Sequence, residues 1–315
     1  MSALLYEIKD EIAWIRFNKP EILNAFDAEE CRQFVKTLKD AAEDKDVRAI
    51  ILSSVGQAFS AGDDLKAALE EYPDIQSGKI HPILDIVEDI TENLQEIPRI
   101  IRRAPKVVIA AVRGYAVGAG FEISIDSDMI VAAEDAIFGF PESNAGMTIT
   151  GGATKLLPMI VGLNKARELM LTGEFIDAHE AYRIGLVNKL VPVGQEEKEA
   201  ERLARVVMSR APMAVLHHKR MVTQSTEADF ETALKALNQL CNKLKVFEPH
   251  QALPLLEIME QAPNDWEGML RATIGVLAIA GKYDELLKAL KLKAQLEQAS
   301  NAEGMYEQAL LSLEV

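Results

Sequence analysis

The chain has 315 residues and a net charge of −15, with 49% hydrophobic and 26% charged residues. This is the composition of a globular protein, so it argues against extended disorder, and the acidic excess argues against nucleic acid as a partner. The two cysteines, Cys31 and Cys241, are too few for a disulfide framework and lack the spacing of metal ligands.

The first 64 residues predict three strands and one helix. Residues 4–10 and 11–18 alternate as two strands joined by a charged turn. Asp27 is predicted to cap a helix, because Glu30 follows three residues later. The apolar, β-branched run 47–55 predicts a buried strand, and the turn FSAGDD follows it.

The middle of the chain repeats the pattern of strand, glycine-containing turn and helix. Residues 105–112 (PKVVIAAV) predict a second buried strand, followed by the turn YAVGAGFE. Residues 122–127 are predicted to be helical, residues 129–140 to return as a strand, and residues 153–171 to be mainly helical. This alternation is typical of an α/β domain whose loops carry the functional site.

The sequence after about residue 195 is predicted to be helical, and its end differs from the rest. Asn264, with Glu267 three residues later, is predicted to cap a helix of the final segment. We therefore divide the chain into an α/β core (1–195), a helical region (196–262) and an extra helical tail (263–315). The tail serves either oligomerisation or partner docking, or it only stabilises an assembly.

Two glycine turns and two carboxylates form the candidate site. If the two buried strands are neighbours, the free N–H groups of both turns converge near helix N-termini, where they would stabilise a developing oxyanion. Glu122 and Glu142 are twenty residues apart, which fits a helix outward and a strand back. In an apolar pocket such a pair divides into an acid and a base. The alternative is a helix-capping Glu122 and a solvated Glu142.

Four stretches resemble the enoyl-CoA hydratase/isomerase (crotonase) family, and they lie within residues 4–225. They read NKPEILNAFD, FSAGDDLK, KVVIAAVRGYAVGAGFEISIDSDMIVAAEDAIFGFPE and GLNKARELMLTGEFIDAHEAYRIGLVNKLVP. The resemblance implies an α/β fold, a crotonase-like spiral of ββα units with C-terminal helices, to which this chain adds its helical tail. It also implies a homotrimer or a dimer of trimers.

The same resemblance implies roles for individual residues. The backbone N–H groups of Asp63 and Ala119 would bind the thioester oxygen as it becomes an enolate. Glu122 would deprotonate water for attack on the β-carbon, and Glu142 would deliver a proton to the α-carbon. This predicts an enoyl-CoA hydratase.

Coenzyme A is expected as part of the substrate, with no separate cofactor and no metal. The predicted CoA-binding residues are Lys19, Ala61, Lys66 and Gly118, the two lysines as phosphate contacts. Family members of this kind also isomerise double bonds, cleave C–C bonds or hydrolyse thioesters, and these reactions remain alternatives. A non-catalytic trimeric scaffold whose tail binds a partner is another. The sequence shows no secretion signal or membrane span, so we expect a cytoplasmic protein.

Overall fold

The computed structural model describes residues 2–64, 66–67, 93–226 and 232. The chain divides into two compact units, residues 1–223 and 224–315. The helices and strands described below belong to the first unit. The last helix, Pro212–Ser225, ends with residues 224 and 225, which are assigned to the second unit. The predicted tail, 263–315, lies outside the described residues.

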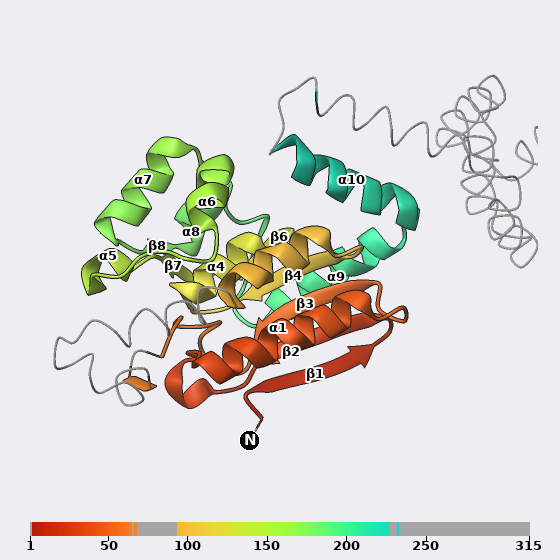
Figure 1. The fold of residues 1–315 in the computed structure, drawn as a ribbon, viewed down its shortest axis with the longest axis horizontal. Helices are drawn as coiled ribbons and strands as arrows, with labels where there is room; N and C mark the ends of the chain where they lie inside the picture. The colour runs from red at the N-terminus through yellow and green to blue at the C-terminus, as the bar shows by residue number, and fades with distance from the viewer. Residues whose placement is uncertain (1, 65, 68–92, 227–231, 233–315) are drawn as a thin grey trace, which may run out of the picture. The chain divides into compact units, whose positions relative to one another are not determined.

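A sheet of six strands forms the centre of the first unit (Figure 1). Its spatial order is β1 (Leu4–Lys9), β2 (Ile12–Phe17), β3 (Ala49–Ser54), β4 (Val107–Val112), β6 (Met129–Ala133) and β9 (Lys189–Val191). β1 pairs antiparallel with β2, and every other pairing in this sheet is parallel. The predicted strand pair at the start and the two predicted buried strands are therefore confirmed.

A smaller sheet lies beside it and consists of β5 (Tyr115–Val117), β7 (Ile137–Gly139) and β8 (Ile176–Asp177). The prediction of one strand over residues 129–140 is wrong, because this run is divided between β6 of the large sheet and β7 of the small one. A turn closed by the Ala136 N–H and the Ala133 carbonyl separates the two strands. β6 pairs with β4, whereas β7 pairs with β5, so the two halves of the run bond to different neighbours.

The described helices are the 3₁₀ helix η1 (Pro20–Ile22), α1 (Ala28–Glu43), helical residues 93–103, α4 (Ala119–Asp126), α5 (Glu142–Ala145), α6 (Ala153–Val161), α7 (Leu163–Thr172), α8 (Ala178–Arg183), α9 (Glu196–Met208) and α10 (Pro212–Ser225). The predicted helices after Asp27 and around residues 122–127 form with shifted boundaries, whereas η1 and α5 were not predicted. Asp27 caps α1 as predicted, in a reciprocal capping box with Glu30. The predicted helix 153–171 is interrupted at Gly162, whose φ of +82° ends α6.

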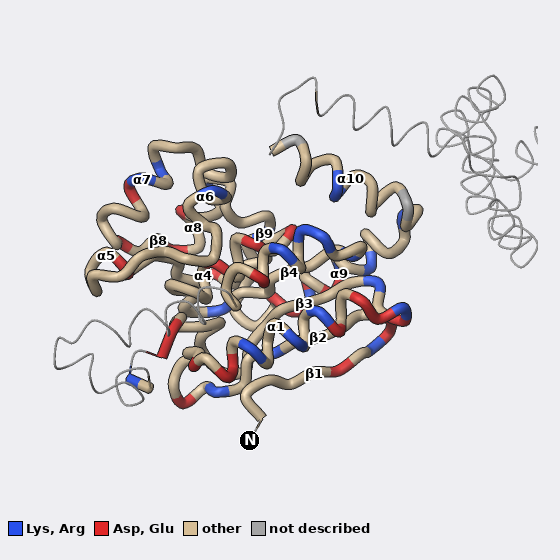
Figure 2. The backbone as a smooth tube through the Cα atoms, viewed as in Figure 1, with Lys and Arg blue, Asp and Glu red and all other residues tan. Residues whose placement is uncertain are grey.

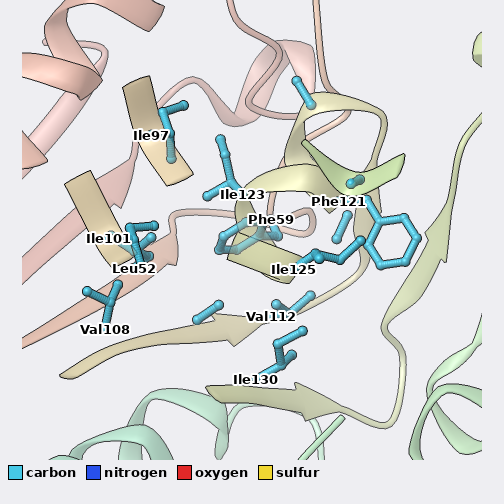
Figure 3. Close-up of a cluster of buried hydrophobic side chains, with 14 of the residues drawn as sticks. Leu52, Phe59, Ile97, Ile101, Val108, Val112, Phe121, Ile123, Ile125 and Ile130 are labelled. Carbon is cyan, nitrogen blue, oxygen red and sulfur yellow. The ribbon is translucent and has the colours of Figure 1, made fainter. Parts of the chain in front are cut away.

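The central strands are buried on both faces, which explains their continuous apolar sequence. On one face, residues such as Leu52, Val108 and Val112 share a core with α1, α4 and helical residues 93–103. Figure 3 shows Ile123 and Ile125 of α4 in that core near Ile97 and Ile101. On the other face, alternate residues of the same strands pack against Ala200 and Ala204 of α9.

This packing fixes α4, which carries Glu122, against the sheet. All eight residues of α4 are buried. Figure 2 shows acidic and basic positions interspersed along α1 and the β1–β2 pair.

Candidate active site

The two glycine turns lie against each other, as the sequence predicted for turns on neighbouring strands. β3 and β4 are adjacent and parallel, and Ser60 of the first turn pairs with Ala116 of β5. A Cβ atom placed on Gly62 would lie 3.1 Å from the Ala119 nitrogen. One placed on Gly120 would lie 2.6 Å from the Ser60 carbonyl oxygen. Side chains at these two positions would therefore force the turns apart.

Two backbone N–H groups remain without an acceptor where the turns meet. Asp63 forms a parallel bridge with Phe26, and the neighbouring Asp64 N–H donates to the Phe26 carbonyl at 2.7 Å. In the part of the chain that the structure describes, neither the Asp63 N–H nor the Ala119 N–H has a hydrogen-bond acceptor. Ala119 is the first residue of α4, where an N–H group lacks an intrahelical partner. Both groups are therefore able to donate to a bound oxyanion.

Glu122 is held in place by a turn distant in sequence. Its Oε1 accepts hydrogen bonds from the Gly151 N–H at 2.7 Å and the Ala153 N–H at 3.4 Å. The residue is only 3% exposed. Burial raises the pKa of Glu122 to about 7, the two hydrogen bonds oppose this rise, and the charges of Glu142 and Asp63 add to it. A carboxyl group with such a pKa is suited to exchange protons at neutral pH.

Glu142 is the first residue of α5, directly after Pro141. Its Oε1 lies 3.1 Å from the place where a Cβ of Gly118 would be, so the carboxyl group is next to the second glycine turn. Oε2 is buried and has no hydrogen-bond partner within the described ranges. Burial raises the pKa of Glu142, and the negative charge of Asp63 raises it further.

The structure bears on the alternative reading of each glutamate. Among the described residues, no side chain caps the N-terminus of α4; the Glu122 carboxylate instead accepts from the 151–153 turn, including the first N–H of α6. Glu142 has a buried oxygen and is not a fully solvated turn residue. The structure brings both glutamates together with the donor groups of Asp63 and Ala119, although their roles in a reaction stay predictions.

The predicted CoA-binding residues have different surroundings. Ala61 and Gly118 belong to the two turns that carry the donor groups. The Lys19 ammonium forms ion pairs with Glu30 and, at 3.8 Å, with Asp27. Lys66 is exposed. Contact of these four residues with coenzyme A stays a prediction.

Sequence reasoning missed two residues that act on Glu122. It does not connect Gly151 with Glu122, to which its N–H donates. Asp126 lies one helical turn beyond Glu122, is 6% exposed, and its Oδ1 has no partner among the described residues. Burial, reinforced by the charge of Glu122, raises the pKa of Asp126 well above its usual range. Only the spacing of four residues between two carboxylates on a helix could have indicated Asp126.

A hollow of about 480 Å³ lies beside the turn that holds Glu122. Among the described residues, its lining comes from Gln95, Pro98 and Arg99 of the 93–103 helix and from residues 149–152 and 154. Gly151 thus contributes to this hollow and also binds Glu122. Within the described ranges, no group of His, Cys, Asp or Glu side chains is arranged to hold a metal ion, and no helix is long and apolar enough to span a membrane.

Comparison with known proteins places the chain in a family. The family model for enoyl-CoA hydratase/isomerase matches residues 7–268. The chain belongs to the enoyl-CoA hydratase/isomerase family. The matched residues include Glu122 and Glu142 and both residues that carry the free N–H groups, Asp63 and Ala119.

Individual members of the enoyl-CoA hydratase/isomerase family resemble the chain over most of their length. It is 32% identical to the short-chain-enoyl-CoA hydratase of Clostridium acetobutylicum over 235 residues, covering 74% of this chain and 86% of that protein. It is 29% identical to the crotonyl-CoA hydratase of Syntrophomonas wolfei over 232 residues, covering 73% and 85%. The crystal structure of an enoyl-CoA hydratase from Bacillus anthracis has a TM-score of 0.68 at 28% identity and covers 76% of this chain and 89% of its own. The predicted α/β crotonase fold is confirmed.

Proposed function

We propose that this protein is an enoyl-CoA hydratase, which adds water across the 2,3 double bond of an acyl-CoA thioester. The observation that carries the proposal is the meeting, in one site, of two carboxyl groups with two N–H groups that have no acceptor among the described residues. A reaction that needs only one acid or base does not require the second carboxyl. The hydratase names of the Clostridium acetobutylicum and Syntrophomonas wolfei relatives support the same reading.

In the proposed reaction, the thioester oxygen accepts hydrogen bonds from the N–H groups of Asp63 and Ala119. Glu122, with Oε1 held by Gly151, takes a proton from water through its other oxygen, and the resulting hydroxide bonds to the β-carbon. The C=C electron pair moves toward the carbonyl, where the two donors stabilise the enolate oxygen. Glu142 then protonates the α-carbon. The reaction leaves Glu122 protonated and Glu142 ionised, and proton exchange with solvent restores both.

The substrate supplies coenzyme A, and the mechanism uses no other cofactor. Ala61 and Gly118 would form the wall beside the thioester, and Lys19 and Lys66 would contact phosphate groups. For Lys19 this requires exchange of its present carboxylate partners for phosphate. The acyl group would extend toward the hollow beside Gly151. We further propose the homotrimer or dimer of trimers that the family resemblance implies.

The test is the loss of enoyl-thioester absorbance when the purified protein is mixed with crotonyl-CoA. Glu122→Gln and Glu142→Gln are each expected to reduce the rate by about 10²–10⁴-fold, the usual contribution of a general acid or base. Glu134→Gln, at an exposed position, is the matched control and should retain the rate. Isothermal titration calorimetry with coenzyme A tests binding separately.

The outcomes distinguish the alternatives. Binding of coenzyme A without loss of absorbance would overturn the hydratase proposal and direct attention to isomerisation, C–C cleavage or thioester hydrolysis, which product analysis separates. Absence of both binding and turnover would contradict the enzymatic function itself.

A further inference from the structure

We propose that Gln95 is a positioning residue for Glu122, and that it acts through the peptide group that joins Thr150 to Gly151. This inference rests on the proposed hydratase function. The rate of proton transfer from water depends on the orientation of the Glu122 carboxylate, and the N–H of this peptide group donates the hydrogen bond that orients it. Gln95 bonds to the opposite edge of the same peptide group and therefore fixes the donor itself.

The 150–151 peptide group has a hydrogen-bond partner on each edge. Its carbonyl, from Thr150, accepts from Nε2 of Gln95 at 3.3 Å, and its N–H, from Gly151, donates to Oε1 of Glu122 at 2.7 Å. A trans peptide group is planar, with its C=O and N–H bonds pointing in opposite directions. Rotation of this group about its flanking bonds therefore moves both contacts together. A partner that fixes the carbonyl also fixes the direction in which the N–H points.

The backbone at this point has little support of its own. Residues 147–152 form neither helix nor strand, and the stretch ends in two consecutive glycines. Gly152 has a φ of +109°, a conformation that glycine adopts without steric cost. Within the described ranges, Gln95 supplies the one hydrogen bond to the Thr150 carbonyl. The orientation of the 150–151 peptide group therefore depends on its side-chain partners.

A second hydrogen bond orients the amide of Gln95. Its Oε1 accepts from Nη2 of Arg99 at 3.2 Å, one turn further along the same helix, and Nη1 of Arg99 donates to Glu96 at 2.7 Å. Arginine can only donate hydrogen bonds, and a backbone carbonyl can only accept them. Both contacts of the amide are satisfied only when Oε1 faces Arg99 and Nε2 faces Thr150. The arginine therefore directs the N–H donor of Gln95 to the peptide group.

The helix that carries Gln95 is anchored in the core that also anchors α4. Ile97 and Ile101 of the 93–103 helix are buried in the same cluster as Ile123 of α4 (Figure 3). The Gln95 side chain, which is half-buried, extends from this packed frame to the peptide group. The catalytic carboxylate on α4 and the side chain that orients its donor are therefore held by one core.

Gln95 and Gly151 also both line the hollow toward which the acyl group would extend. A role of Gln95 in binding the acyl group would appear in KM, whereas positioning of Glu122 appears in kcat. Crotonyl-CoA separates the two roles, because its acyl chain has a single carbon beyond the double bond.

The test compares Gln95→Met with Gln33→Met, the same substitution at an exposed position of α1. Methionine keeps the length and helix propensity of glutamine but has no N–H donor in its side chain. With crotonyl-CoA, kcat should fall about 3–10-fold in Gln95→Met, the effect of losing one neutral hydrogen bond, while KM changes less. Gln33→Met should retain both constants. Gln95→Glu keeps the shape of glutamine and places an acceptor against the Thr150 carbonyl, so its kcat should fall at least as far.

Hydrogen–deuterium exchange at the Gly151 amide is a second measurement, and it does not depend on turnover. Exchange at Gly151 should be about 3–10-fold faster in Gln95→Met than in the wild type, because the peptide group has lost its partner on the carbonyl edge. The amides of the 93–103 helix should keep their wild-type rates. A role confined to stabilising that helix would instead accelerate exchange along the whole of it.

The outcomes separate this proposal from the proposed function. In an active enzyme, an unchanged kcat or unchanged exchange at Gly151 in Gln95→Met would overturn the positioning role. Faster exchange spread over the 93–103 helix would also overturn it. A wild type that does not hydrate crotonyl-CoA, together with faster exchange confined to Gly151 in Gln95→Met, would contradict the hydratase function and support the role of Gln95 in orienting the donor to Glu122.

Discussion

The Gly151 N–H donates a 2.7 Å hydrogen bond to Oε1 of Glu122, joining residues that are 29 positions apart. This bond connects the first turn of α4 with the turn before α6 and leaves the second carboxylate oxygen for a reactant. A carboxylate that is buried needs such a partner, because an unpaired buried charge is costly. The bond therefore orients Glu122 and partly offsets the rise in its pKa that burial causes.

Gly151→Ala is expected to lower kcat by about 10-fold with a smaller change in KM, because the Glu122 carboxylate would have to shift by a few tenths of an ångström and the rate depends steeply on the position of a catalytic group. A Cβ at residue 151 would lie 3.0 Å from the Glu122 carboxyl carbon and from Oε2, so the carboxylate must move. Steady-state kinetics with crotonyl-CoA measures the change. Glu134→Gln, at an exposed position outside the site, is the control. Kinetics in Gly151→Ala equal to those of this control would contradict the positioning role of Gly151.

A comparison of Gly118→Ala with Gly146→Ala separates the effect of backbone strain from the effect of contact with Glu142. Both glycines have positive φ, +56° and +69°. Gly146 is left-handed, so its substitution should destabilise the protein by about 1–2 kcal/mol, whereas Gly118, with ψ −127°, lies outside that region and its substitution should cost up to about 3 kcal/mol. Only at Gly118 would the new methyl group meet Oε1 of Glu142, at 3.1 Å, whereas residue 146 has no atom within 4 Å. We expect large loss of activity in Gly118→Ala and near-normal activity in Gly146→Ala. Denaturant unfolding confirms that both variants fold, and loss of activity in both would show that strain alone is responsible.

Glu122→Gln is expected to become more stable than the wild type as the pH rises from 5 to 8. The pKa of Glu122 is raised from 4.5 to about 7, so between these values the folded protein holds a proton that the unfolded chain has released. The wild type therefore loses stability from this group as the pH rises through that window, by at most roughly 3 kcal/mol, whereas neutral glutamine loses none. Unfolding by urea at pH 5 and pH 8 measures the difference. A gap that does not widen with pH, relative to Glu134→Gln, would contradict the raised pKa.

Lys66→Gln and Lys19→Gln are expected to behave differently. Lys66 is exposed, so its replacement should raise KM for crotonyl-CoA a few-fold without loss of stability if it contacts phosphate. Lys19 is bonded to the carboxylate of Glu30, which is buried, so its replacement should also destabilise the protein by about 1–3 kcal/mol. KM measured at low and high salt, together with thermal unfolding, tests both expectations. A KM unaffected by either substitution would remove the lysines from the CoA site.

Patterns within short stretches of sequence were sufficient to predict several helices and strands of the first unit. The capping box of Asp27 and Glu30 is a contact over three residues, and it forms as its sequence indicates. The buried strands β3 and β4 were recognisable because burial on both faces requires an uninterrupted apolar run. The motifs around Glu122 and Glu142 also indicated the family, which the comparison confirms.

The sequence by itself predicted the two buried strands and the capped helix α1, because these depend on residue type and short spacing, and its motifs indicated the family and, through that resemblance, the candidate acid and base. Tertiary structure alone decided that residues 129–140 divide between two sheets, because strand pairing depends on which neighbours have free backbone groups. It alone brought the Gly151 N–H to the carboxylate of Glu122, 29 residues away. The protonation of the site likewise depends on burial and on charges from separate elements, and these exist only after the chain has folded.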